Sequence, residues 1–238
     1  MYRLRGFFVV ALLCSAVLWS TSTVQAQTPT PTPSTWGSIK AMYGVSDKGN
    51  SPAGAPGGYP NYCFMLSVPF IVQVPPGDWT NTKNCGQACA VMVGGYFNGS
   101  SVNSSAISAQ NSYLYSITGD SRYKDANGWY TGGSKLWVYQ SLLSNYHHLK
   151  NTVRYGSSAN DVVNELTWGH PVICGVMIKG GRLVSSGGVS HWTLAIGWDS
   201  NIIFNDPGTS SGRYIRYSIS AFEASWATQG KIYIPVSR

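Results

Sequence analysis

The chain has 238 residues, of which 13% are aromatic, 11% are charged and 27 are glycine, and its formal net charge is +7. The sixteen lysines and arginines are scattered along the sequence and form no basic stripe, which argues against a nucleic-acid-binding protein. Few charges together with many aromatic residues and glycines favour an extracellular globular domain rich in strands and loops.

Residues 1–26 have the layout of a secretory signal peptide. Arg3 and Arg5 precede an apolar stretch, and small residues follow up to Ala26, after which we expect cleavage. No later segment is long and apolar enough to span a bilayer. We therefore expect a secreted protein, extracellular or in the cell envelope, without stable membrane insertion.

The remainder of the chain divides by composition into three parts. Residues 27–35 alternate proline and threonine, which predicts an extended linker. Residues 36–64 form an N-terminal arm whose role the sequence does not indicate. Residues 65–238 have the length of one domain with a substantial core.

The first predicted elements of this domain are a strand and a helix. The run MLSVPFIVQV from Met65 is rich in β-forming residues and ends before Pro75-Pro76. A helix is expected from Cys85, with Gly94 and Gly95 weakening its end. Its apolar residues recur at three- and four-residue steps, which predicts one buried face, formed by Cys85, Ala88, Cys89, Met92, Val93 and Tyr96.

The following segments predict helices first and strands afterwards. Helices are expected around residues 102–115 and 134–146, and a third, capped by Asn160-Asp161, ends at Gly169. From Pro171 five apolar runs joined by short turns predict strands: PVICGVMIKG, HWTLAIGWD, NIIFNDPG, GRYIRYSI and KIYIPVS. Segregated helices and an antiparallel sheet define the α+β class.

Four cysteines remain after the signal peptide, namely Cys63, Cys85, Cys89 and Cys174. An even number in an oxidising compartment favours two disulfides. Cys174 is expected to be buried and free, or paired with Cys63 or Cys89, whereas Cys85 is expected to be free. The cysteines and histidines lack zinc-site spacing, so we expect neither a metal nor an organic cofactor.

Cys85 is the candidate nucleophile, because it stands where a polar loop turns into the predicted helix. The unpaired N–H groups and the positive end of the helix dipole would stabilise a thiolate there. The alternative is a core thiol, which is the better interpretation of Cys89, one turn further along the helix.

A thiolate nucleophile needs a histidine to manage its proton, and the chain has four. His147 and His148 lie at a helix end, where exposure or interaction with the dipole explains them, and His170 lies in a turn. His191 opens an apolar strand after a glycine-rich loop and is therefore the candidate base. Its alternative is an ordinary histidine at a strand edge.

Two further residues complete the candidate site. Asp206 ends the strand after that of His191, so a hairpin would bring its carboxylate beside the imidazole, although an aspartate before Pro-Gly is often only a turn residue. Gln73, at the end of the strand before the helix, could donate its amide N–H, together with the backbone N–H of Cys85, to a developing oxyanion. A solvent-facing strand glutamine is the alternative.

The order Gln, Cys, His, Asp is that of papain-type active sites. The segments VPFIVQ, NCGQACAVMV, WGHPVICGV, SHWTLAIGWD and IIFNDPG resemble the double-glycine-peptidase-like (bacteriocin-processing-peptidase-like) group of papain-fold cysteine peptidases. The resemblance covers about residues 66–235 and implies Cys85 as nucleophile, His191 as base, Asp206 as orienting group and Gln73 in the oxyanion hole. Gln87 replaces the more usual proline after Cys-Gly.

The sequence therefore predicts a secreted, monomeric cysteine peptidase that acts on peptide or protein substrates through an acyl-thioester. One alternative is a cell-wall amidohydrolase of the CHAP type, which shares the Cys-His order and the fold. Another is a catalytically inactive module of the same fold that binds peptide or glycan through its tryptophans and tyrosines.

Overall fold

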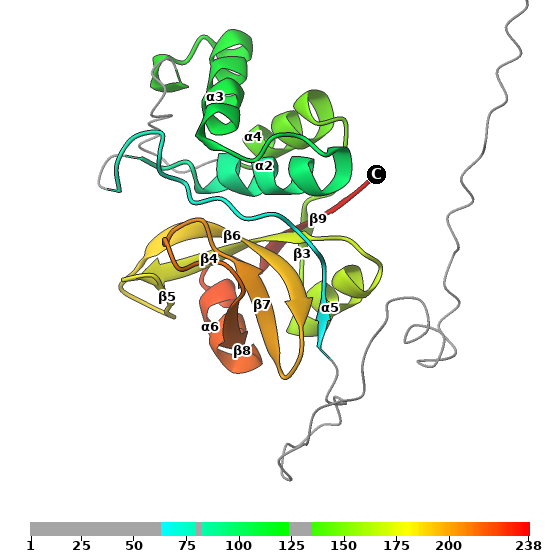
Figure 1. Ribbon diagram of the computed structural model, residues 1–238. Coiled ribbons are helices and arrows are strands. Elements are labelled where there is room, and N and C mark those ends of the chain that lie inside the picture. Colours follow the sequence, from blue (N-terminus) through cyan, green and yellow to red (C-terminus); the bar gives the residue numbers. More distant parts are fainter. Residues whose placement is uncertain (1–62, 80–81, 124–134) are drawn as a thin grey trace, which may run out of the picture. The chain divides into compact units, whose positions relative to one another are not determined.

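The computed structural model describes residues 63–79, 82–123 and 135–238, all within one compact unit, Tyr43–Arg238. The predicted signal peptide and linker, and nearly all of the predicted N-terminal arm, lie outside the described residues. Figure 1 shows the described part as a sheet between two groups of helices.

The sheet is antiparallel, and its strands follow the order β2-β9-β4-β6-β7-β8. The short strands β1, β3 and β5 pair with β6, β9 and β4 respectively. The strands are β1 Phe64–Met65, β2 Lys150–Asn151, β3 Arg154–Tyr155, β4 Val172–Lys179, β5 Arg182–Leu183, β6 Val189–Trp198, β7 Asn201–Asn205, β8 Ile215–Ser218 and β9 Ile232–Ser237.

The helices cover both faces of the sheet, with α2, α3 and α4 on one side and α5 and α6 on the other (Figure 1). Because both faces are covered, most residues of β4, β6 and β7 are buried, which explains their nearly continuous apolar sequences. The helical segments are α2 Cys85–Asn98, α3 Ser104–Thr118, the 3₁₀ turn η1 Ser121–Tyr123, α4 Leu136–Gln140, the π-helical η2 Ser141–Tyr146, α5 Ala159–Thr167 and α6 Ile219–Ala227.

The α+β class predicted from the sequence is confirmed, with the helix that begins at Cys85 packed on the sheet. Two predicted details of the strands are wrong. Only Phe64–Met65 is a strand before α2. Leu66 N–H still donates to Ile196 O in β6 at 2.8 Å, but residues 67–74 belong to no strand, and Pro69 within them lacks a backbone donor. The connection from β8 to β9 is not a short turn but contains α6.

Two details of the helices also differ from prediction. The first ten residues of α2 are all buried, not one face of them, because α3, η2 and β6 surround the helix. The helix α5 starts two residues earlier than expected, with Ser158 as its N-cap and Asp161 completing a capping box.

The cysteines form no disulfide among the described residues. Cys63 is exposed, and Cys85, Cys89 and Cys174 are buried as free thiols. The prediction of two disulfides is therefore wrong, whereas the expectation of a buried, free Cys174 agrees with the structure. Burial of apolar side chains, not cross-linking, stabilises this fold.

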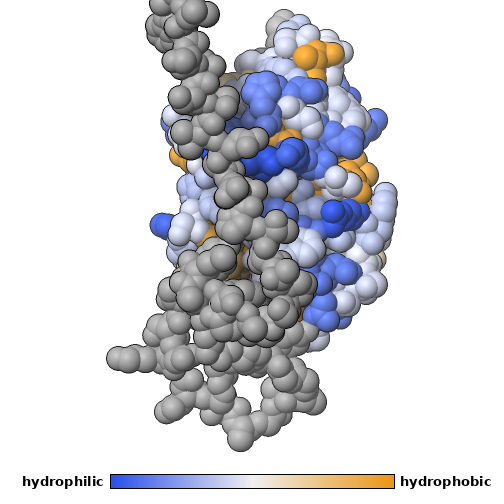
Figure 2. All heavy atoms as spheres, turned by 90° about the vertical axis from the view of Figure 1, so that its right-hand side faces the viewer, coloured by the Kyte–Doolittle hydropathy of each residue, from blue (hydrophilic) through white to orange (hydrophobic). Residues whose placement is uncertain are grey.

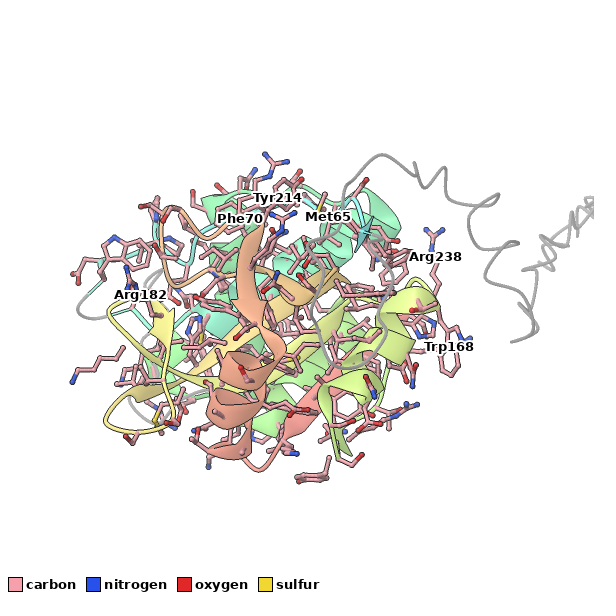
Figure 3. The ribbon with its side chains drawn as sticks, turned by 90° about the horizontal axis from the view of Figure 1, so that it is seen from below. Met65, Phe70, Trp168, Arg182, Tyr214 and Arg238 are labelled. Carbon is pink, nitrogen blue, oxygen red and sulfur yellow. The ribbon has the colours of Figure 1, made fainter. Side chains whose placement is uncertain are left out.

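The surface carries isolated hydrophobic side chains among hydrophilic ones, as Figure 2 shows for one face. Seen from below, Trp168 after α5 and Arg182 in β5 lie at opposite edges of the molecule (Figure 3). Among the helices that the structure describes, none has the length and apolar character needed to cross a membrane.

Gly94 leaves room for a buried histidine against the third turn of α2. A Cβ atom at this position would lie 2.4 Å from the ring of His147, which is itself 6% exposed. We expect Gly94→Ala to lower the free energy of unfolding by about 1–3 kcal/mol, because the ring cannot move away without disturbing its buried surroundings. Urea denaturation measures this, and Ser112→Ala on exposed helix surface is the control. Equal midpoints in both variants would contradict the packing described.

Candidate active site

Cys85 is the first residue of α2, and its side chain is buried at the helix N-terminus. The backbone N–H groups of Gly86 and Trp192 donate hydrogen bonds to its sulfur. Gly86 follows directly, and a Cβ atom there would overlap the ring of Tyr139. A glycine at position 86 is therefore required by the packing next to the thiol.

A buried chain of amides fixes the start of α2. Gln87 donates from Nε2 to Asn111 Oδ1 at 2.9 Å, and Asn111 donates from Nδ2 to Asn84 Oδ1 at 3.2 Å. All three residues are fully buried. Gln87, which departs from the more usual proline of the resembling family, thus ties the residue before Cys85 to α3.

His191 and Asp206 come together through the β6–β7 hairpin. Leu194 pairs with Asn205, so Asp206 follows the last paired residue of β7 on the side of the hairpin where His191 lies. The Nε2 atom of His191 lies 2.6 Å from Asp206 Oδ1, and both side chains are buried. Gly208 N–H donates to the same oxygen at 2.8 Å, and a side chain at Gly208 would clash with the imidazole.

The contact with Asp206 leaves the other ring nitrogen of His191 for Cys85, whose side chain is hydrogen-bonded to the imidazole. The three side chains thus form a chain from thiol to imidazole to carboxylate. Asp206 Oδ2 is buried without a hydrogen bond among the described residues. The imidazole of His191 is therefore the nearest side chain that can balance the negative charge of Asp206. This charge favours the protonated form of the imidazole.

The pKa values of Cys85 and His191 shift in opposite directions. Burial alone would raise the pKa of Cys85, but the hydrogen bond and charge of His191, with the two backbone N–H groups, lower it below its ordinary value. Burial alone would lower the pKa of His191, but Asp206 and Cys85 raise it to about 10. Between the two pKa values the pair is a thiolate and an imidazolium.

These groups open onto a cleft of about 880 Å³ lined also by Gln73. Several exposed large apolar side chains stand around it: Trp79, Trp137 and Val189 are 50%, 41% and 66% exposed. A cleft of this size can take a segment of extended peptide with apolar side chains.

Gln73 lies at this cleft but not on a strand, contrary to the prediction. Its backbone N–H donates to Pro207 O at 2.9 Å, which fastens the segment to the loop after Asp206. Its side chain is 9% exposed, and Nε2 donates to Thr82 O at 3.4 Å, a long hydrogen bond that leaves the second N–H of the amide available. The structure therefore places Gln73, Cys85 and His191 at one cleft, and Asp206 fully buried in contact with the imidazole of His191.

The remaining histidines lie elsewhere. His147 is buried, so the prediction that exposure explains it is wrong. The Nδ1 atom of His170 lies 2.8 Å from the buried Glu165.

Three groups that position Cys85 were not predicted from the sequence: Asn84, Asn111 and the backbone N–H of Trp192. No short motif marks the two asparagines, since their relation depends on the packing of α2 against α3.

Cys89 provides a test that separates packing from chemistry. It is fully buried, its sulfur contacts Trp192 O at 3.7 Å, and burial raises its pKa well above the ordinary value. We expect Cys89→Ser to lower the free energy of unfolding by about 1–2 kcal/mol through burial of a more polar group, while the alkylation rate of Cys85 stays within about twofold. Thermal unfolding and iodoacetamide kinetics measure the two effects. Loss of alkylation in a folded Cys89→Ser protein would make Cys89, not Cys85, the reactive thiol.

A known protein family matches this chain. The model of the Peptidase_C39-like family matches residues 65–234, which contain the whole of the described cleft. A search of curated proteins found no match.

A solved structure supports the same fold. A proposed C39-like peptidase from Bacillus anthracis has a TM-score of 0.52 and 18% sequence identity to this chain, and the match covers 74% of this chain and 98% of the other. At this identity the likeness establishes the fold only, an α+β fold of the papain-like type.

Proposed function

Because the chain belongs to the Peptidase_C39-like family, we propose that it is a secreted cysteine peptidase that hydrolyses peptide bonds through Cys85, His191 and Asp206. The observation that carries the proposal is the continuous contact from the Cys85 thiol to the imidazole and from Nε2 to Asp206 Oδ1 at 2.6 Å, at the wall of an open cleft. The family membership suggests the activity, and the contacts supply a chemical route to it.

In the proposed mechanism the Cys85 thiolate attacks the carbonyl carbon of the scissile bond. His191, held as imidazolium by Asp206, then donates its proton to the departing amine nitrogen, and an acyl-thioester remains. The imidazole afterwards accepts a proton from water, which attacks the thioester and releases the carboxylate. The carboxylate of Asp206 orients the ring and stabilises its positive charge throughout.

The oxyanion of each tetrahedral intermediate requires hydrogen-bond donors. We assign this role to the second Nε2–H of Gln73 and the backbone N–H of Cys85, because both residues line the same cleft. The bond from Gln73 to Thr82 O keeps the amide at the cleft wall. No metal or organic cofactor enters any step.

The substrate in this proposal is a peptide that lies extended along the cleft. The side chains of Trp79, Trp137 and Val189 would contact apolar residues of the substrate on either side of the scissile bond. Burial of such side chains contributes to binding in proportion to the apolar area removed from water.

Incubation of the purified protein with casein and with purified peptidoglycan tests the proposal. We expect peptide fragments from casein, with new amino termini that increase linearly in time, and none in the presence of excess iodoacetamide. Release of cell-wall fragments without casein cleavage would instead identify a cell-wall amidohydrolase. Absence of any hydrolysis together with a slowly alkylated thiol would identify an inactive binding module.

A further inference from the structure

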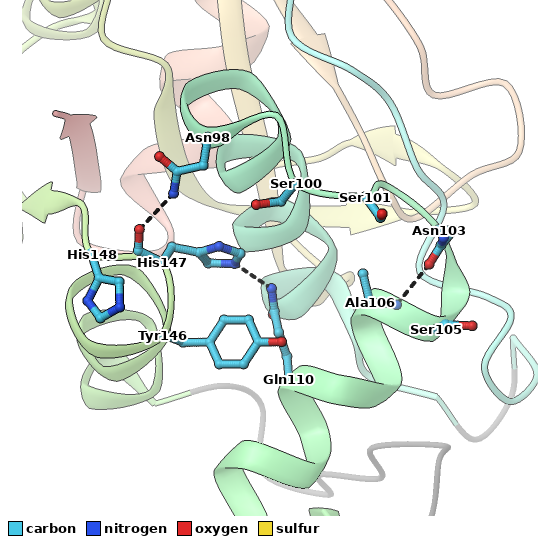
Figure 4. Close-up of a pocket in the computed structure, with 10 residues that line it drawn as sticks. All are labelled: Asn98, Ser100, Ser101, Asn103, Ser105, Ala106, Gln110, Tyr146, His147 and His148. Carbon is cyan, nitrogen blue, oxygen red and sulfur yellow. Dashed lines mark hydrogen bonds between the residues drawn. The ribbon is translucent and has the colours of Figure 1, made fainter.

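A second pocket, of about 550 Å³, lies at the opposite end of α2 from Cys85. The end of α2, the start of α3 and the end of η2 surround it, and Figure 4 shows their side chains around a common space. Its volume is within the range of roughly 300–1,000 Å³ usual for small-ligand sites. None of its lining residues belongs to the catalytic cleft, so the pocket is separate from the proposed peptidase chemistry.

The lining of this pocket mixes polar and apolar surface; among the described residues that line it there is no lysine, arginine, aspartate or glutamate, and His148 is its exposed ionisable side chain. Amides and hydroxyl groups predominate, contributed by Asn98, Asn103, Gln110, Ser100, Ser101 and Ser105. A cationic ligand would lose its hydration without meeting an acidic group, an anionic one would meet only the exposed His148, and a wholly apolar ligand would leave the amides and hydroxyl groups unpaired. The wall therefore suits a neutral ligand with many hydroxyl groups.

The floor of the pocket is a buried and uncharged pair. Burial, assisted by the neighbouring charge of His148, lowers the pKa of His147 to about 4, so its imidazole is neutral at physiological pH. With the Gln110 amide oriented to satisfy both groups, its oxygen accepts from His147 Nε2 at 2.8 Å and its nitrogen donates to Gln87 O at 3.1 Å. Gln110 Oε1 also accepts from Val91 N–H at 3.3 Å, so the pair ties the pocket floor to α2 at two residues.

Tyr146 provides an aromatic surface at the side of the pocket. Its ring packs against Tyr113 at 5.2 Å and edge-on against His147 at 5.0 Å, so its orientation is fixed before any ligand binds. Tyrosine combines a flat apolar ring with a hydroxyl group and loses little conformational entropy on binding. A pyranose ring has the matching features: an apolar C–H face to stack on the aromatic ring and hydroxyl groups at its edge.

We propose that this pocket binds a neutral saccharide, with Tyr146 as the stacking surface and the serine and asparagine side chains as hydrogen-bonding partners of the sugar hydroxyl groups. Asn98 and Asn103 are each partly engaged, through Nδ2 to His147 O at 2.7 Å and through Oδ1 from Ala106 N–H at 2.9 Å. Both residues line the pocket, and Asn98 Oδ1 and Asn103 Nδ2 are the acceptor and the donor that these two bonds leave for a ligand. Such a site would hold the protein on a glycan while the separate cleft acts on peptide.

Isothermal titration of the full chain with cellotetraose, maltotetraose and chitotetraose tests the proposal, and trigalacturonate serves as a charged comparator. We expect one-to-one binding of at least one neutral oligosaccharide, and the sugar preferred identifies a glucan or an N-acetylglucosamine polymer as its source. Failure of all three to bind at millimolar concentration, or tighter binding of trigalacturonate, would overturn the proposal.

Variants locate the binding. Tyr146→Ala should weaken it at least tenfold, and Ser101→Trp, which fills the pocket from an exposed position, should do the same without disturbing the core. Trp137→Ala, at the catalytic cleft, is the matched control and should leave the affinity within twofold. Unchanged affinity in a folded Ser101→Trp protein, or loss of binding in Trp137→Ala, would place the saccharide elsewhere and overturn the assignment whatever the outcome for peptidase activity.

Discussion

Replacement of Cys85 by serine is expected to lower kcat/KM for peptide hydrolysis by at least about 1,000-fold. Burial opposes ionisation of the Cys85 thiol, but His191 and two backbone N–H groups outweigh it and lower the thiol pKa, which favours the thiolate. A serine hydroxyl in the same place stays protonated, and the thiolate nucleophile is lost. Initial rates on a fluorogenic peptide selected from the casein fragments measure the effect.

Cys63→Ser is the matched control for this substitution, since Cys63 is an exposed, free thiol outside the cleft. It should retain full activity. Thermal unfolding should show both variants folded, because Cys85→Ser changes a single atom at the edge of the core. Comparable turnover by Cys85→Ser and the unmodified protein would remove Cys85 from the mechanism.

The pH dependence of hydrolysis is expected to be bell-shaped and to change when Asp206 is replaced. Activity should rise as Cys85 ionises below its ordinary pKa and fall as His191 loses its proton near its pKa of about 10. Asp206→Asn keeps a hydrogen-bonding group but removes the negative charge that holds the imidazolium. The alkaline limb should therefore move to lower pH by about 1–3 units.

His191→Ala removes the proton donor itself and should lower kcat by about 10²–10⁴-fold at every pH. Asp199→Asn is the control for Asp206→Asn, because Asp199 pairs with Arg216 on the surface. It should leave both limbs in place. An alkaline limb that does not move in folded Asp206→Asn would show that the carboxylate does not sustain the imidazolium.

Local patterns in the sequence were sufficient for the fold class and for the order of the site. The switch from three- and four-residue spacing to continuous apolar runs at Pro171 predicts the change from helices to strands. Cys85 at a helix start, His191 at a strand start and Asp206 at the end of the next strand each follow from local signals. The hairpin register then brings the last two together, because Asp206 follows Asn205, which is paired with Leu194.

Features that depend on packing between distant segments could not be predicted in this way. The burial of the first ten residues of α2 on all sides requires α3 and η2 against the face that periodicity leaves unassigned. Gln73 lies on an irregular segment whose backbone is held by Pro207. The sequence Ile219–Ala227 is rich in apolar residues between two strands, and its nine-residue helix α6 is too short for periodicity to separate from a turn.

The rate of iodoacetamide alkylation of Cys85 as a function of pH, in the unmodified protein and in His191→Ala, tests the central claim most directly, since it requires no substrate. Peptide mass spectrometry identifies the alkylated thiol. If the pair exists, Cys85 of the unmodified protein is alkylated with an apparent pKa below that of a free cysteine, about 8.5. In His191→Ala the midpoint moves to higher pH, because burial still raises the thiol pKa and only the two backbone N–H groups remain to lower it. Coincident curves with a midpoint near the free-cysteine value would contradict a coupled thiolate and imidazolium.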